Sequence, residues 1–584
     1  MSFKKYKYVL LTVLTFSFSQ NQYQEWSEGP YGTEFFDIAA PFTLNEINSS
    51  IPGDVNSDEI LNVLDLIQLV GHILETSEFD SNQISIADIN NDSIVDILDI
   101  ISIVNMIIGG YQIGWNFENE WNGYESYIFI HYNTAIAGSQ ALWLSNTKES
   151  LLNDSPDNVH YFFLSSRSTA ESDVEGMANV FNEIIQEMSP EMQDHWNNHL
   201  HFCPVRVPEL DNWLVDALEG EYAIGIDRFQ RIKQIGYLGN PASFTGTYMN
   251  YLTHEAVYYN YEHNALSEPL STYDEIEVFN RTPYTGGWAA TISQIVTFPN
   301  EQILNNYDKM SVELLRGCPD TNGNYSDQGC DDYDRIARMY ICEEDGSECL
   351  EIAKWITPFD RQPHSLTDIS PMLSTIRPGG SKMIKFQESG WPNSLLTLKF
   401  RFYDETSESA PTSHVPLWNS TVQFNPDYDE NRPPQVFNVP QNATKIEFVS
   451  FLSGHGWGSA GCFNCCEFCN SRHTFIINGG THEFQKSHPN ATDNNYCMEL
   501  GTIIQGVVPN QYGTWGYGRA GWCPGMDVAP YIVDITDHVE FGQDNIIDYE
   551  ACRVSGNSCV APPTCQGDGY CPEVAMSSYI IIYE

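Results

Sequence analysis

Residues 465–484, CCEFCNSRHTFIINGGTHEF, place an acidic residue between cysteines and run directly into a predicted β-hairpin. Two short runs of strand-forming residues flank Asn478-Gly479-Gly480, and such residues accept the positive φ angles of a tight turn. If Cys465 pairs with Cys469, the ring leaves Glu467 few conformations, which suits a carboxylate that must act in one fixed direction. The stretch therefore predicts an antiparallel β fold with a rigidly held acid beside a strand.

The same pattern of short strands and turns extends from about residue 295 to the C-terminus. A second hairpin is predicted over 335–356, with Cys342 and Cys349 closing its tip, and the Pro-rich stretch 424–440 divides the region in two. Both halves contain an Asp-Ile-Ser/Thr turn followed by a Gly-containing loop and another strand. We expect two adjacent antiparallel jelly-roll sandwiches, over residues 295–428 and 435–584.

An internal repeat near the N-terminus predicts two calcium loops. Residues 53–66 and 87–100 align, and in each the loop positions 1, 3, 5, 9 and 12 carry Asp or Asn, while position 7 offers a backbone carbonyl. The candidate ligands are Asp54, Asn56, Asp58, Ile60, Asn62 and Asp65, then Asp88, Asn90, Asp92, Ile94, Asp96 and Asp99. The alternative is a pair of ordinary acidic loops.

Each of these loops leads into an apolar helical run, and the pair resembles dockerin modules. The resemblance implies a module over 51–110 that binds structural Ca²⁺, two ions for two loops, and that a cohesin-like protein is a candidate partner. Glu59 and Ser93 replace the Gly that the family places at loop position 6.

Residues 20–50 and 111–290 are expected to form one α/β domain, into which the calcium module is inserted. The segments 126–132 and 158–166 are apolar enough for buried strands, and 174–188 has helical apolar spacing. The opening of the domain resembles thioredoxin-like proteins. No Cys-x-x-Cys follows, so redox chemistry is not supported.

The net charge and the N-terminal segment predict an exported protein. The formal net charge is −51, which argues against nucleic acid or an anionic membrane as partner, since phosphates are bound by Lys and Arg. Lys4, Lys5 and Lys7 precede an apolar run and small residues at cleavage spacing, so residues 1–19 are expected to be a signal peptide. We expect a secreted or periplasmic bacterial protein, monomeric, without a membrane span.

Fourteen of the 15 cysteines lie between Cys318 and Cys571. This density in an exported chain favours disulfides over a zinc site at residues 462–469, although the latter spacing is also a zinc pattern. The local pairs expected are Cys318–Cys330, Cys342–Cys349, Cys462–Cys466, Cys465–Cys469, Cys497–Cys523, Cys552–Cys559 and Cys565–Cys571.

Several acids stand among aromatic residues and cysteines, a composition that suits sugar recognition, although each acid could instead cap a turn. Five segments, CDDYDRIARMYI (330–341), WITPF (355–359), QESGW (387–391), CCEFCNSRHTFIING (465–479) and GRAGWCPGMDV (518–528), resemble the peptide:N-glycosidase F family in order and approximate spacing. The similarity covers about residues 300–584.

The resemblance implies hydrolysis of the amide bond between N-acetylglucosamine and Asn of an N-glycoprotein, without a catalytic metal or cofactor. It implies three catalytic acids, with Asp334 as the principal acid/base, Glu467 beside it and Glu388 as the third. It further implies that substrate is bound by Arg335, Arg519, Trp391, Trp522, Tyr333 and Trp457. Tyr333 stands where the family has Trp, and one residue is inserted between Glu388 and Trp391, which leaves glycan preference open.

Three other functions are compatible with parts of the sequence. A lectin-like protein would share the sandwiches and the aromatic groove without turnover. A copper monooxygenase also uses paired jelly rolls, but its clustered His ligands have no His-x-His counterpart here. A glycosidase would use two carboxylates to cut between sugars and leave one sugar on the peptide.

Overall fold

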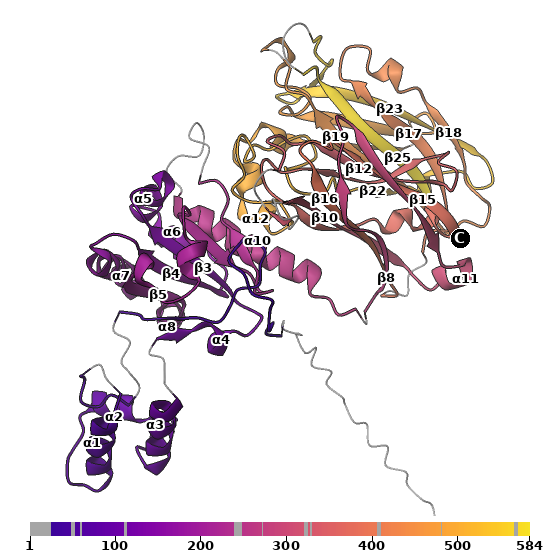
Figure 1. The fold of residues 1–584 in the computed structure, drawn as a ribbon. Coiled ribbons are helices and arrows are strands. Elements are labelled where there is room, and N and C mark those ends of the chain that lie inside the picture. The colour runs from indigo at the N-terminus through magenta and orange to yellow at the C-terminus, as the bar shows by residue number, and fades with distance from the viewer. Residues whose placement is uncertain are drawn as a thin grey trace, which may run out of the picture.

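The computed structural model describes residues 25–47, 53–58, 61–90, 92–109, 114–238, 248–270, 272–319, 325–326, 330–405, 410–458, 460–480, 482–565 and 570–584. Three bodies are visible: an α/β body, a small helical module attached to it, and a larger β-rich body (Figure 1). The predicted signal peptide lies outside the described residues, as does Ile60 of the first calcium loop. Among the described residues, no helix is both long and apolar enough to cross a membrane.

The α/β body is built on a five-stranded sheet of order β5-β4-β3-β6-β7. Its strands are β3 (Ser126–Tyr132), β4 (Val159–Ser165), β5 (Leu200–Arg206), β6 (Ala223–Ile226) and β7 (Ile232–Gln234). β3, β4 and β5 run parallel, whereas β6 and β7 are antiparallel to their neighbours. Every residue of β3 and β4 is buried, as expected for strands covered on both faces.

Helices cover this sheet because their apolar residues recur at helical spacing. In α7 (Ala170–Gln186), Val174, Met177, Phe181 and Ile185 form the buried stripe, which confirms the predicted helix. The other helices of this body are α4 (Phe117–Glu120), α5 (Ala137–Trp143), α6 (Lys148–Asp154), α8 (Pro190–His199), α9 (Leu214–Ala217) and α10 (Tyr248–Leu266).

The helical module leaves and rejoins the α/β body at one place. Strands β1 (Thr43–Leu44) and β2 (Trp115–Asn116) pair antiparallel on either side of it. The module contains α1 (Val63–Ile73), α2 (Ser81–Ala87) and α3 (Ile97–Gly109), around a small core of Val55, Leu69, Ala87 and Ile103. So small a core is marginal by itself, and bound ions are a common remedy.

The β-rich body contains two pairs of antiparallel sheets. In the first pair one sheet has the order β8-β16-β10 and the other β13-β12-β15-β9, with β14 and β11 paired to β10. These strands are β8 (Asp274–Tyr284), β9 (Ala290–Phe298), β10 (Lys309–Pro319), β11 (Tyr325–Ser326), β12 (Ile336–Glu343), β13 (Leu350–Ile356), β14 (His364–Asp368), β15 (Gly380–Glu388) and β16 (Ser394–Tyr403).

The second pair repeats this arrangement with sheets of order β17-β25-β19-β22 and β18-β23-β20-β21, and β24 pairs with β23. These strands are β17 (Ser413–Gln423), β18 (Gln435–Asn438), β19 (Lys445–His455), β20 (Ser471–Ile477), β21 (His482–Ser487), β22 (Tyr531–Asp534), β23 (Asp544–Ser555), β24 (Ser558–Val560) and β25 (Glu573–Tyr583). Both predicted hairpins are confirmed, as β12–β13 and β20–β21. The turn of the latter has positive φ at Asn478, Gly479 and Gly480.

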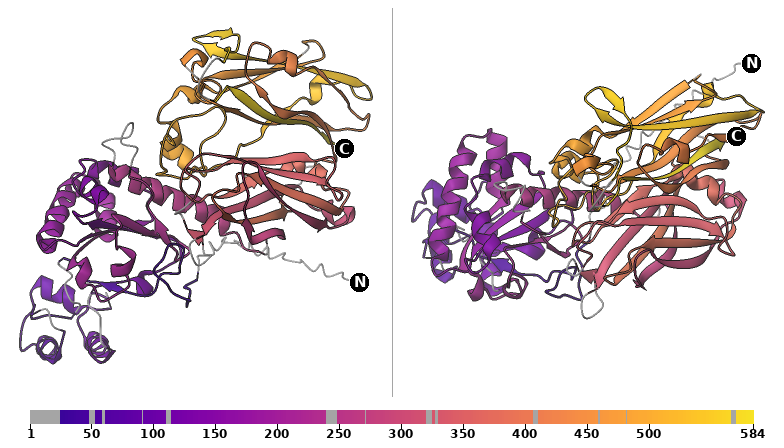
Figure 2. Two further views of the ribbon diagram at one scale, coloured as in Figure 1. Left: turned by 45° about the horizontal axis from the view of Figure 1, so that its top comes forward. Right: turned by 90° about the horizontal axis from the view of Figure 1, so that it is seen from above.

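Strands β19 and β25 belong to two cores at once. Phe448 and Ile580 face the core of the second sheet pair, whereas Val449 and Tyr579 join that of the first. Successive side chains point to opposite faces of a strand, so a strand buried on both faces must be apolar throughout. The two halves therefore pack closely against each other (Figure 2).

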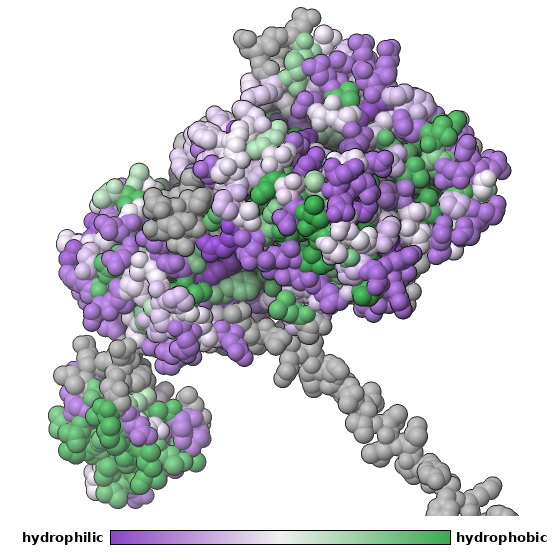
Figure 3. Space-filling model, turned by 45° about the vertical axis from the view of Figure 1, so that its right-hand side comes forward, coloured by the Kyte–Doolittle hydropathy of each residue, from purple (hydrophilic) through white to green (hydrophobic). Residues whose placement is uncertain are grey.

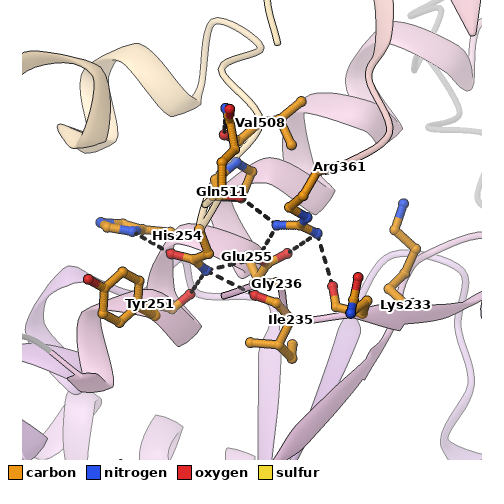
Figure 4. Close-up of polar contacts among 12 residues, drawn as sticks. Lys233, Ile235, Gly236, Tyr251, His254, Glu255, Arg361, Val508 and Gln511 are labelled. Carbon is orange, nitrogen blue, oxygen red and sulfur yellow. Dashed lines mark hydrogen bonds and ion pairs between the residues drawn. The ribbon is translucent and has the colours of Figure 1, made fainter. Parts of the chain in front are cut away.

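The helix α10 joins the α/β body to the β-rich body through a buried polar network (Figure 4). Arg361, in the loop after β13, contacts the Glu255 carboxylate (Nη1–Oε1 2.7 Å) and donates to the carbonyls of Pro509 (2.5 Å) and Gln234 (3.0 Å). The amide of Asn510 donates to the same carboxylate (2.8 Å). Residues from three distant segments are thus fixed to one another.

Six disulfides are formed: Cys318–Cys330, Cys342–Cys349, Cys465–Cys469, Cys497–Cys523, Cys552–Cys559 and Cys565–Cys571. The predicted Cys462–Cys466 bond is wrong. Cys466 lies in the core of the second sheet pair, close to Gly454, whereas the Cys462 side chain faces Gly458, so the two sulfurs turn to different neighbours. Disulfides in this number are typical of proteins outside the cytoplasm.

Candidate active site

A cavity of about 890 Å³ opens between the two halves of the β-rich body. Its lining combines carboxylates with aromatic rings. The acids are Asp332, Asp334, Glu467 and Glu573, and the rings include Trp288, Tyr333, Phe359, Trp457, Phe468, Tyr512, Trp522 and Tyr570. Apolar ring faces stack on the faces of sugars while carboxylates accept hydrogen bonds, so this lining suits a carbohydrate ligand.

Asp334 reaches the cavity from the segment just before β12. The backbone there is fixed on both sides: Arg335 donates its N–H to Thr357 Oγ1 (2.7 Å), and Thr357 donates back to the Arg335 carbonyl (2.9 Å). The Cys318–Cys330 disulfide closes the same segment a few residues earlier. Asp334 is thereby held at the groove with a side chain that is 21% exposed.

Glu467 reaches the cavity from the other half, inside the ring closed by Cys465 and Cys469. Its N–H donates to the Gly456 carbonyl (3.0 Å), just beyond the end of β19, and its own carbonyl accepts from Ala520 (2.9 Å). Both backbone polar groups of Glu467 are used, so the residue has little freedom to move.

Arg519 lies between the two acids. Its Nε is 3.1 Å from Glu467 Oε1 and 3.6 Å from Asp334 Oδ2. The rest of its guanidinium donates to the carbonyls of Thr514, Trp515 and Tyr517. The central guanidinium carbon, Cζ, lies 4.9 Å from the centre of the Trp522 ring. The arginine is fully buried and cannot swing away, so it acts as a fixed positive charge for both carboxyl groups.

Burial raises the pKa of both acids. Loss of water raises the pKa of Asp334 to about 6, although Arg519 and Arg335 oppose the shift. Burial, followed by repulsion from Asp334, raises the pKa of Glu467 to about 7, and Arg519 again opposes it. Near neutral pH the pair therefore holds about one proton, so one acid accepts a proton while the other donates one.

Arg335 supports the rim of the groove. It pairs with the buried Asp331 (2.8 Å) and stacks on the rings of Trp288 and Tyr333, with distances of 4.1 and 4.9 Å to the ring centres. Tyr333, Trp457 and Trp522, to which the resemblance assigns substrate binding, all line the cavity. Trp522 is anchored by a hydrogen bond from its Nε1 to the Gly454 carbonyl (2.8 Å).

Glu388 and Trp391 do not join the other predicted residues. Glu388 is fully buried at the end of β15 in an ion pair with Arg316, and burial raises its pKa. Trp391 is 71% exposed and does not line the cavity. A direct catalytic role for Glu388 is not supported, because a side chain closed off from the groove cannot touch a substrate held there.

Several groove residues are not predicted from the sequence. Trp288, Tyr512 and the pair Tyr570 and Glu573 come from three separate segments, and no local motif links them. Phe359 lies in the WITPF segment, which carries part of the family resemblance. His455 stacks on Trp522 with 5.4 Å between ring centres, a contact that only the folded structure reveals. His455 also contacts Ser453 Oγ (2.7 Å).

The described residues of each predicted calcium loop are linked by hydrogen bonds within the loop. Asp54, Asp65 and Asp99 are buried although they are acidic. Asp65 accepts from the N–H of Asn62 (2.9 Å), and in the second loop Asp99 accepts from Asp96 (2.8 Å). Burial and the nearby carboxylates of Asp54 and Asp58 raise the pKa of Asp65. Crowded, dehydrated acids of this kind fit a hard cation.

Comparisons with known proteins agree with the motifs. Residues 423–581 match the family described as Peptide-N-glycosidase F, C terminal, and residues 52–108 match the dockerin type I domain. Peptide-N(4)-(N-acetyl-beta-D-glucosaminyl)asparagine amidase F of Elizabethkingia miricola is 24% identical over 345 residues, which are 54% of this chain and 86% of that protein.

Solved structures of similar proteins cover the same half. Recombinant peptide:N-glycanase F is 20% identical, over 54% of this chain and 96% of that one, with a TM-score of 0.41. PNGase F, a glycosylasparaginase from Flavobacterium meningosepticum, is 21% identical over 53% and 96%, with a TM-score of 0.40. The resemblance drawn from the motifs is thus confirmed: residues 423–581 are similar to the C-terminal domain of peptide-N-glycosidase F, and residues 52–108 to a type I dockerin domain.

Proposed function

We propose that the β-rich half is a glycoamidase, which hydrolyses the amide bond between N-acetylglucosamine and Asn in N-glycoproteins. The observation that carries the proposal is the pairing of Asp334 and Glu467 across the groove, both bridged by Arg519. The similarity to an asparagine amidase over the same half supports it.

The reaction divides between the two acids according to their proton affinity. Asp334, the stronger acid, takes a proton from water as the water oxygen bonds to the amide carbon of the substrate Asn. Glu467, the weaker acid, gives its proton to the leaving nitrogen as the carbon–nitrogen bond breaks. The products are a peptide with Asp in place of Asn and a glycosylamine. Arg519 stabilises the negative charge shared by Asp334 and Glu467 throughout the reaction. This scheme requires no metal.

Glu388 acts on this reaction from a distance. It pairs with the buried Arg316, and its backbone N–H donates to Tyr284 Oη (2.9 Å). We therefore assign it a positioning role, in place of contact with the substrate. Its loss should slow the reaction indirectly, because Arg316 would then be buried without this counter-ion.

The strand orders support jelly-roll sandwiches in both halves. Counted within each half, the sheets have the orders 1-8-3-6 and 2-7-4-5, which is the order of a jelly roll when β11 and β24 are set aside. In the α/β body, the order β4-β3-β6-β7, in which β4, β3 and β7 run in one direction and β6 in the other, supports a thioredoxin-like core.

The test is a mass measurement on a denatured N-glycoprotein treated with the full chain. We expect glycan release with a gain of about one mass unit at each former glycosylation site, since NH₂ becomes OH. Asp334→Asn should abolish release, whereas Asp332→Asn, which alters a neighbouring acid of the same groove, should retain most of it. A remnant sugar on the peptide would instead indicate a glycosidase, and tight glycan binding without release a lectin-like protein.

Copper chemistry has little support in the described residues. His473 and His488 both contact the Ser471 hydroxyl, while His455 contacts Ser453. Among the described residues, these histidines belong to no group of three side chains close enough to hold a metal ion.

The helical module is proposed to bind Ca²⁺ through the two loops and to dock a cohesin-like partner. Helices α1 and α3 leave large apolar side chains in solvent, and this surface is visible as green atoms on the separate lower body in Figure 3. They include Val63, Leu64, Ile67, Val70, Ile97, Leu98, Ile101 and Ile108. Binding of a purified type I cohesin in calcium, lost in EGTA and in Leu64→Asp, would support the assignment; equal binding by Leu64→Asp would contradict it.

A further inference from the structure

Four histidines and two glutamates gather in the α/β body, outside the groove and outside the calcium loops. Glu125 directly precedes β3, His160 is the second residue of β4, and His199 ends α8 just before β5. The cluster therefore occupies the amino-terminal edge of the three parallel strands, a part of the molecule to which the glycoamidase proposal assigns no task (Figure 1).

The ligand atoms of Glu125, His160 and His199 have the spacing of a metal site. His160 Nε2 lies 3.1 Å from Glu125 Oε2, and His199 Nε2 lies 3.5 Å from Glu125 Oε1. All three ligand atoms are within 4.8 Å of one another. Ligands at roughly 2.0–2.2 Å around a tetrahedral ion are about 3.3–3.6 Å apart, so the two measured separations from Glu125 fit such an ion with small adjustments.

Hydrogen bonds to the far side of each ring decide which nitrogen carries the proton. His199 Nδ1 contacts the His195 carbonyl (2.8 Å), which can only accept, so Nδ1 carries the hydrogen. His201 Nδ1 donates to the Glu46 carboxylate (2.5 Å), which leaves a lone pair on His201 Nε2. This nitrogen accepts from His160 Nδ1 (2.8 Å), so the hydrogen of the His160 ring is on Nδ1.

The two Nε2 atoms that face Glu125 are therefore both lone-pair donors. With neutral rings in these tautomers, the two nitrogens and the Glu125 carboxylate repel one another unless a positive charge lies between them, which is either a bound metal ion or a proton on one ring. Outer partners that fix the tautomer of a ligating histidine, here a backbone carbonyl and a Glu–His relay, are the usual surroundings of a bound metal.

We propose that Glu125, His160 and His199 bind a divalent transition-metal ion, and that the ion is zinc. Imidazole nitrogens favour zinc over calcium or magnesium, which prefer oxygen. His195 lies one turn before His199 on α8, and its ring stacks on that of His199 at 4.1 Å. Its Nε2 is buried without a hydrogen-bond partner in the described part of the chain, and a rotation of the ring would make it the fourth ligand.

The position of the site indicates a structural ion. Open α/β sheets bind their substrates beyond the carboxyl ends of the strands, which is the opposite edge. The three side chains are only 9–19% exposed. The ion would cross-link the starts of β3 and β4 to the α8–β5 junction, while the Glu46–His201 contact extends the cluster to the segment from which the helical module departs.

The test uses the full chain, dialysed with Zn²⁺ and then freed of unbound metal, with zinc counted by inductively coupled plasma mass spectrometry. We expect one zinc per chain and a higher melting temperature with zinc than without. Glu125→Gln should lower the zinc content at least tenfold, because its amide can donate to an Nε2 atom and keep the fold while removing the charge. The melting temperature of this variant should no longer respond to zinc.

Two control variants separate this site from other metal-binding residues. His482→Ala alters a stacked histidine pair elsewhere in the chain and should keep its zinc. The double variant Asp65→Asn/Asp99→Asn should lose calcium and keep zinc. A wild-type chain without stoichiometric zinc, or Glu125→Gln with as much zinc as wild type, would overturn the proposal.

A direct measurement does not depend on any variant. Cobalt(II) titrated into the metal-free wild-type chain should give the intense visible absorption of a tetrahedral site, saturating at one equivalent and lost on addition of zinc. Absence of a saturable band would also refute the site. Glycan release is unaffected by either outcome, so failure here leaves the glycoamidase proposal standing.

Discussion

Replacement of Arg519 by Met should move the pH profile of glycan release to higher pH. The arginine is the positive charge shared by Asp334 (3.6 Å) and Glu467 (3.1 Å), and in its presence their pKa values are about 6 and about 7. Without it, each carboxylate loses a favourable interaction and holds its proton more tightly. Both limbs of a bell-shaped profile should therefore shift upward.

The size of the shift follows from Coulomb's law. A unit charge 3.6 Å from Asp334 contributes ~2–5 kcal/mol at effective dielectric constants of about 20–40. Because the side chain of Asp334 is 21% exposed, we take the lower end, ~2 kcal/mol, which corresponds to ~1.5 pH units. The acid limb should then lie near pH 7.5, and kcat/KM at pH 6.5 should fall roughly sixfold to eightfold and recover in alkaline buffer.

The assay is kcat/KM for release of glycan from a defined glycopeptide, measured from acid to alkaline pH. Arg519→Lys is the matched control, since it keeps the charge but loses the contacts with the carbonyls of Thr514, Trp515 and Tyr517. Circular dichroism and melting temperature establish that both variants are folded. The charge of Arg519 does not set the pKa values of Asp334 and Glu467 if Arg519→Met has the same pH profile as the wild type. The same conclusion follows if Arg519→Lys shifts the profile as much as Arg519→Met does.

Three further predictions concern stability and calcium affinity. Asp334→Asn should stabilise the fold by up to ~3 kcal/mol at pH 8 and by much less at pH 4. Because folding raises the pKa of this carboxyl group to about 6, the free energy of unfolding of the wild type falls as pH rises from about 4 through 6. Thermal melts of both proteins at the two pH values test this. Ser93→Gly should tighten calcium binding about fivefold, since Ser93 has a φ of 67° and glycine removes ~1 kcal/mol of backbone strain. Calorimetric titration with calcium measures both affinities, and equal affinities would contradict the strain. Glu255→Gln should cost ~3 kcal/mol in urea unfolding because it leaves Arg361 buried without its counter-ion, whereas Glu219→Gln, at an exposed site, should cost little.

Local features were predictable because their causes are local. The Asn478-Gly479-Gly480 turn, the β12–β13 hairpin and six disulfides join residues that are close in the chain, where spacing alone limits the geometry. Cys462 and Cys466 show the limit of this reasoning. Their spacing permits a bond, but packing in the core directs the Cys466 side chain elsewhere.

The groove shows which predictions needed more than spacing. Asp334, Glu467 and Arg519 were expected at one site only through resemblance to a known family, and the fold does place them within hydrogen-bonding or ion-pair reach. Glu388 was expected there too, but it ends a strand whose side chain at that position points into the interior. A motif specifies residue types, whereas the direction of a side chain depends on the strand and sheet that carry it.

The amino-acid sequence by itself determined the disulfide-closed loop around Glu467 and its hairpin, the two-part β region, the calcium repeat and the acidic character of the chain. These properties depend on composition, periodicity and short spacings. Only the tertiary structure decided that Arg519 lies between two acids, that Trp288, Tyr512 and Tyr570 share one groove, and that Glu125, His160 and His199 converge. Such contacts join segments far apart in the chain, and they form only when burial of the common cores brings those segments together.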